Sequence, residues 1–130
     1  MKIAIALKET LPTGLLANAT ACIASGLFTN MSLLGKELQG TDCVFAPITK
    51  IPILIMKQNN KPWCELLKRA KRNALEYVVF TKEAQSTTSY EEYEARVTNK
   101  KLAEVDVLGI GVLGEDKAVT GFCGDLPLLH

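Results

Sequence analysis

The feature that most constrains the fold is the alternation of four short apolar runs with three segments of helical periodicity. The apolar runs are Ile3–Leu7, Ile51–Met56, Tyr77–Thr81 and Val105–Gly114. The helical segments between them span Pro12 to about Ser25, Pro62 to about Asn73 and Tyr90 to about Ala103. Strands that alternate with helices predict an α/β fold with helices on both faces of a mainly parallel sheet. Because 130 residues suffice for one hydrophobic core, we expect a single domain over residues 1–130.

Local signals support these segments. Pro12 suits the first turn of a helix, and one apolar stripe at helical spacing follows it, made of Leu15, Leu16, Ala19, Cys22 and Ile23. Ser89 and Glu92 form a capping-box pattern. The glycines of Val105–Gly114 indicate a bend or a close approach of another backbone. Thr29–Lys50 is the longest stretch without a clear element, and it suits a short hairpin or a lid.

The charge pattern argues against nucleic acid and membranes as partners. The formal net charge is only +1, so no global field attracts the chain to either surface. Residues 57–72 carry six cations opposed by Glu65 alone, and we interpret them as a solvated helix face. No apolar run is long enough to cross a bilayer. Lys8 and Glu9 end the first run too early for a secretion signal, so we expect a cytoplasmic protein.

The cysteine and histidine pattern gives no sign of a metal site. Cys22, Cys43, Cys64 and Cys123 form no CxxC pair, and the only histidine is the last residue, His130. A chain with a core of this size needs no disulfide framework. We therefore expect buried, reduced thiols, no metal and no cofactor.

A candidate ligand site follows from the expected topology. Ligands of open α/β sheets bind beyond the carboxyl ends of the strands, and the amides of a helix's first turn favour anions. The polar residues placed there are Lys8, Thr10, Thr13, Asn18 and Thr81. The alternative is purely structural: Thr13 caps the helix, Asn18 faces solvent, and Thr20 bonds back to its own helix.

No nucleophile or nucleotide motif is present. The sequence contains no GxSxG, no P-loop and no GxGxxG between a strand and a helix. The glycine-rich run Gly109–Gly114 lies inside the last expected strand, so it does not indicate a phosphate loop.

The chain resembles a family of uncharacterised bacterial proteins, DUF2000. The resemblance rests on the opening "KIAIALKETLPTGLLANATACIASGL" and on three later blocks, "PILIM", "VVFTKEAQSTTSYEE" and "VLGIGVLGEDKAVTGF". It implies a fold similar to type II peptidyl-tRNA hydrolase. That fold is a three-layer α/β/α sandwich with a mixed four-stranded sheet whose last strand is antiparallel.

The same resemblance bears on function. Those hydrolases carry a Gly-Lys step near the start of the first helix, then a glutamine and a histidine. The nearest equivalents here are Gly14-Leu15, Ala19 and Cys22, which lack the cation and the proton shuttle. We therefore expect a small-ligand-binding or regulatory module, with a small anionic ligand, that forms a homodimer. The alternatives are a hydrolase acting on peptidyl-tRNA or another acyl ester, and an oligomer whose polar residues only cap and solvate.

Overall fold

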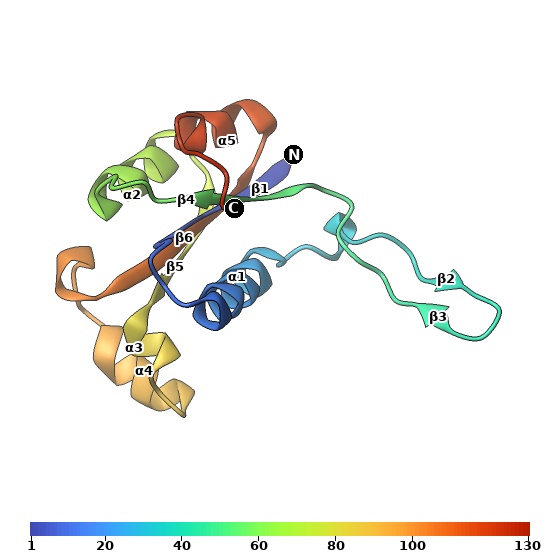
Figure 1. Ribbon diagram of the computed structural model, residues 1–130, viewed down its shortest axis with the longest axis horizontal. Helices are drawn as coiled ribbons and strands as arrows, with labels where there is room; N and C mark the ends of the chain where they lie inside the picture. The colour runs from blue at the N-terminus through green and yellow to red at the C-terminus, as the bar shows by residue number, and fades with distance from the viewer.

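The computed structural model describes all 130 residues, and its centre is one four-stranded mixed sheet. The strands are β1 (Lys2–Leu7), β4 (Ile53–Lys57), β5 (Glu76–Thr81) and β6 (Val107–Gly114). Their order across the sheet is β4-β1-β6-β5 (Figure 1). β1 and β4 are parallel, and β6 is antiparallel to both β1 and β5. The expected mixed sheet is therefore confirmed, including its antiparallel last strand.

The mainly parallel sheet expected from the alternation alone is wrong at β6. The segment after β5 contains α3 (Lys82–Gln85) and α4 (Tyr90–Val97), and it does not cross to the opposite end of the sheet. Lys82 N instead donates a hydrogen bond of 2.8 Å to Asp106 O. β6 thus begins at the end of the sheet where β5 finishes, so it has to run antiparallel to β5.

Helices cover both faces of the sheet. α1 (Thr13–Leu27) packs on one face, and α2 (Trp63–Arg72) and α5 (Asp116–Cys123) pack on the other (Figure 1). β1 is an interior strand, and residues 3–7 have no exposed surface. Its alternate side chains contribute to the two separate core clusters, which is why the run is apolar without interruption.

Two of the three glycines of β6, Gly109 and Gly111, let α1 approach the sheet closely. A Cβ atom added at Gly109 would lie 2.8 Å from Ile23 Cδ1, and one at Gly111 would lie 2.2 Å from Ile23 Cγ2. A side chain at either position would therefore force the Ile23 side chain, or α1 with it, to shift. The expectation of a close approach is confirmed.

Two helical expectations need correction. The third helix ends at Val97 rather than near Ala103, and a separate 3-10 turn follows at Leu102–Glu104. Asn99 adopts a positive φ of 63° between them, a conformation that ends a helix. α5 follows the last strand and was not anticipated at all. The chain has no helix long and apolar enough to span a membrane.

Residues 31–50 form a projection that we call the arm. It contains a 3-10 turn (Met31–Leu33) and the short antiparallel strands β2 (Leu38–Gln39) and β3 (Val44–Phe45). The arm extends away from the sheet and its helices (Figure 1). The short hairpin expected in this stretch is confirmed.

The expectation of buried thiols holds only for Cys123. Cys22, Cys43 and Cys64 are exposed, because the buried stripe of α1 is narrow (Ala19, Ile23 and Leu27) and Cys43 lies in the arm. Burial raises the pKa of the Cys123 thiol, so its reactive thiolate is disfavoured.

We predict that iodoacetamide at mildly alkaline pH modifies the three exposed cysteines at least roughly tenfold faster than Cys123. Peptide mass spectrometry of a time course measures each site separately. Equal rates at all four sites in the folded protein would show that α5 is not packed as described.

A second surface feature ties α2 to the end of the chain. Asp125 accepts hydrogen bonds from Arg69 Nη1 at 2.6 Å and Nη2 at 3.1 Å, and Lys61 Nζ lies 3.1 Å from its Oδ2. The hydrogen bonds from Arg69, and after them the contact with Lys61, hold the pKa of the Asp125 carboxyl well below its ordinary value of 3.8.

A carboxyl group whose pKa is lowered by folding stabilises the native state. The full contribution is present at pH values above the pKa in the unfolded chain, and it is lost at pH values below the pKa in the folded protein. We therefore expect Asp125→Asn to reduce the free energy of unfolding at about pH 7, with the difference from wild type shrinking toward about pH 2. Urea denaturation at several pH values measures it. A difference that stays constant with pH would contradict the ion pair.

Candidate functional site

The carboxyl ends of β1, β4 and β5 lie at the same end of the sheet, as expected. The strand β6 lies between β1 and β5 and separates their carboxyl ends. Lys8 N donates a hydrogen bond of 2.9 Å to Leu108 O, at the start of β6. β1 and β5 are therefore two strand spacings apart, about 10 Å. Lys8, which follows β1, and Thr81, which ends β5, thus stand on opposite sides of β6.

The N-terminal end of α1, which we call its mouth, is exposed. Pro12 is its N-cap residue and no side chain caps the helix, so the interpretation of Thr13 as a cap is wrong. Thr10 and Thr13 both face solvent. Glu9 reaches β4's end instead, where its carboxylate accepts a hydrogen bond of 3.2 Å from Asn59 N.

Asn18 and α3 are brought together. Gln85 Nε2 donates to Asn18 Oδ1 at 3.1 Å and to Leu15 O at 3.3 Å. Thr81 is buried and caps α3, its hydroxyl accepting from Ala84 N at 3.3 Å. Thr20 donates to Leu16 O at 2.9 Å, which confirms its structural interpretation. The structure thus joins Asn18 to the helix that Thr81 caps, while Lys8, Thr10 and Thr13 lie apart from this contact.

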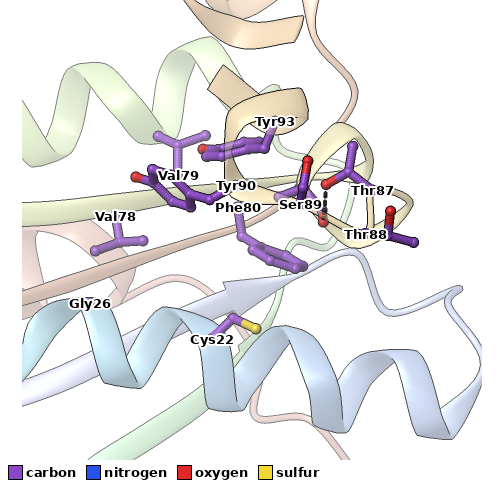
Figure 2. Close-up of a pocket in the computed structure, with 11 residues that line it drawn as sticks. Cys22, Gly26, Val78, Val79, Phe80, Thr87, Thr88, Ser89, Tyr90 and Tyr93 are labelled. Atoms are coloured by element: carbon purple, nitrogen blue, oxygen red, sulfur yellow. Dashed lines mark hydrogen bonds between the residues drawn. The ribbon is translucent and has the colours of Figure 1, made fainter. Parts of the chain in front are cut away.

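One turn further along α1, a cavity of about 470 Å³ opens between α1, β5 and the α3–α4 segment (Figure 2). It is lined by Cys22, Gly26, Val78, Val79, Phe80, Ala84, Thr87, Thr88, Ser89, Tyr90 and Tyr93. A Cβ atom at Gly26 would lie 3.0 Å from Val78 Cγ2. Gly26 therefore lets this end of α1 come close to β5 and sets the width of the cavity's floor.

Hydroxyl groups occupy one end of the cavity. Thr87 Oγ1 donates to Ala84 O at 3.3 Å (Figure 2). Ser89 Oγ accepts from Glu92 N at 3.2 Å. The Ser89 hydroxyl accepts this bond and donates none within the chain, so its proton is free for a ligand. This end can therefore both donate to and accept from a polar group.

The rest of the wall is mainly apolar, and its other hydroxyls are the phenol groups of Tyr90 and Tyr93, which point away from Thr88 and Ser89 (Figure 2). No lysine, arginine, histidine, aspartate or glutamate lines the cavity. Burial raises the pKa of the Tyr93 phenol above its ordinary value, which keeps that group neutral. Tyr90 and Tyr93 pack edge to face, with ring centroids 5.6 Å apart. The two rings lie on the side of the cavity opposite Cys22 and Gly26 (Figure 2).

Comparison with known proteins identifies the family. A model described as a protein of unknown function, DUF2000, matches residues 1–130. The chain belongs to the DUF2000 family. No curated protein matches it. The structure of a protein of unknown function from Agrobacterium tumefaciens strain C58 has the same fold. It aligns at a TM-score of 0.87 over 98% of this chain and 96% of that one, at 19% sequence identity.

The chemistry available in the cavity of this DUF2000 protein is limited. Cys22 is a nucleophile in principle, but no histidine, carboxylate or amine lines the cavity to act as its base. Groups of three or more metal-ligating side chains are absent from the chain. The arrangement can hold a molecule and orient it through hydroxyls, but it supplies no proton shuttle.

Most lining residues escaped the sequence analysis. The signals that could have found them are the polar run Ser86–Ser89 between two helical segments and the four-residue spacing of Cys22 and Gly26 on α1. Neither feature is specific, because polar runs between helices usually only form turns.

Proposed function

We propose that this DUF2000 protein binds a small, uncharged and mainly apolar molecule that has one polar end. The observation that carries the proposal is the cavity between α1, β5 and α3–α4, with its apolar wall and its hydroxyl end. Its volume of about 470 Å³ is within the range typical of small-molecule sites. The proposal moves the expected ligand-binding role to a cavity one turn along α1 from Asn18.

The lining determines the class of ligand. Val78, Phe80 and the tyrosine rings favour an aromatic ring or a short aliphatic chain. The hydroxyls of Thr88 and Ser89 suit an alcohol, phenol or amide group. A carboxylate or phosphate is disfavoured because no cation lines the cavity to replace its lost hydration.

Two earlier hypotheses stay predictions. A small anion at the mouth of α1 would use Lys8, Thr10 and Thr13, which are separate from this cavity. A likeness to the fold of type II peptidyl-tRNA hydrolase, and hydrolysis of peptidyl-tRNA or another acyl ester, would need an acid–base group that the cavity lining does not provide.

The proposal is tested with 4-methylphenol, cyclohexanol and 1-octanol as probes in thermal unfolding. We expect at least one of them to raise the Tm of the wild-type protein, by roughly 5 °C at a concentration of about ten times its Kd. Cys22→Trp fills the cavity and abolishes this shift. Cys64→Trp is the matched control, since Cys64 is also an exposed helical cysteine but lies on α2, outside the cavity.

The three possible outcomes distinguish binding in the cavity from binding elsewhere and from no binding. A shift in the wild type and in Cys64→Trp but not in Cys22→Trp supports the cavity. A shift of the same size in all three proteins places binding elsewhere, and no shift with any probe refutes the proposed ligand class.

A further inference from the structure

The arm carries a concentration of exposed apolar side chains. Every residue from Lys36 to Ile48 is exposed. The large hydrophobic side chains exposed on the arm, with their exposed fractions, are Met31 (76%), Leu38 (53%), Val44 (53%), Phe45 (56%) and Ile48 (76%). Scattered apolar residues on a surface need no explanation, but five on one short projection mark an interaction site.

The hairpin of the arm is too short to be a stable folding unit by itself. Two pairs of residues, Leu38 with Phe45 and Gln39 with Val44, form its whole ladder near the tip. A bridge between Leu34 and Thr49 closes its base. An isolated two-stranded hairpin is marginally stable in water, so this projection requires a covering surface.

The arm also offers a receiving surface of its own. Between the ladder and the base its two sides part and leave a hollow of about 770 Å³, lined by Leu38, Phe45 and Ile48 among others. The same segment therefore supplies both projecting apolar side chains and an apolar hollow. An interface between identical copies about a two-fold axis has this requirement, because one patch has to complement itself.

We propose that the arms of two copies of this chain pack against each other and form a symmetric dimer. With roughly 150–200 Å² for each large apolar residue, the exposed fractions place on the order of 500 Å² of apolar surface on one arm. Two arms bring on the order of 1,000 Å², and the polar atoms of residues 36–48 add to it. The total approaches the 1,200–2,000 Å² typical of specific interfaces, about the lower limit of that class.

The charges of the arm favour a second copy over a strongly charged partner. The arm contains two cations, Lys36 and Lys50, and two anions, Glu37 and Asp42. Two arms therefore approach without net repulsion, and the opposite charges of the two copies can pair at the rim. A nucleic acid or an acidic surface would gain no net attraction.

Analytical ultracentrifugation of the full chain tests the proposal. We expect wild type to sediment at twice its chain mass of 14.2 kDa at micromolar concentration. Phe45→Glu and, independently, Ile48→Lys raise the dimer Kd by roughly 100-fold or more, because each dimer contains two copies of the substitution at the centre of the interface. Both side chains are exposed in the monomer, and circular dichroism verifies that the variants are folded.

Tyr90→Glu is the control. Tyr90 is an exposed aromatic residue (71%) on α4, at the cavity rather than on the arm. A dimeric wild type and Tyr90→Glu, with monomeric arm variants, support the arm interface. A monomeric wild type, arm variants that remain dimeric, or a monomeric Tyr90→Glu protein each overturns it. The last outcome would place the dimer contact at the cavity instead.

Discussion

Replacing Gly111 with valine is expected to lower the free energy of unfolding by about 3 kcal/mol or more, and the Tm by roughly 10 °C. The Cβ atom alone would lie 2.2 Å from Ile23 Cγ2, 3.1 Å from Leu27 Cδ1 and 3.3 Å from Ile5 Cγ1. Since these neighbours are fully or almost fully buried, none can move into solvent. α1 has to move away from the sheet, and the cavity floor moves with it. Urea denaturation followed by circular dichroism measures the loss.

Two further variants make this prediction specific. Gly14→Ala adds a methyl group where nothing lies within 4 Å, and we expect it to stabilise α1 by up to about 1 kcal/mol. Ile23→Ala removes the atoms that Gly111 approaches most closely. In that background the Gly111→Val change is expected to cost less than in wild type. Strictly additive effects would show that α1 does not rest on Gly111.

Phe122→Ala is expected to cost about 3–5 kcal/mol, the range for truncating a fully buried aromatic residue. Phe122 lies on α5 in the core of the opposite face, among Leu66, Ala70 and Val119. Its removal leaves a cavity in the buried cluster that α2 and α5 form with the sheet. Chemical denaturation gives the value directly.

Lys117→Ala on the same helix is the control for Phe122→Ala. Lys117 is exposed, so its removal is expected to change the free energy of unfolding by no more than about 0.5 kcal/mol. If Phe122→Ala were as mild as this control, α5 would not be part of the core.

The sequence predicts where the strands of the sheet lie, because the apolar pattern that marks each strand is contained in the strand's own few residues. Ile3–Leu7 is apolar throughout since both faces of an interior strand are covered. The direction of β6 leaves no such mark, because the sequence pattern of a strand buried on both faces is the same in either direction. α5 escaped because eight residues hold only two helical turns, and Thr120 and Gly121 weaken its propensity.

The candidate site was predicted less completely, for a different physical reason. Asn18 is joined to Gln85 across 67 residues of chain, and no local pattern encodes a contact of that kind. The cavity depends on where α3 and α4 settle against α1 after β5 ends. Cys22 was interpreted as part of a buried stripe, but only one narrow face of α1 meets the sheet.

The central claim is that the cavity between α1 and α3–α4 binds a small uncharged ligand. Its most direct test is a titration of isotope-labelled protein with 4-methylphenol, followed by amide chemical shifts in nitrogen–proton correlation spectra. The expected result is saturable shifts confined to residues 19–26, 78–80 and 84–93. Shifts concentrated at residues 8–13 or on the arm, or no saturable shift at all, would contradict it.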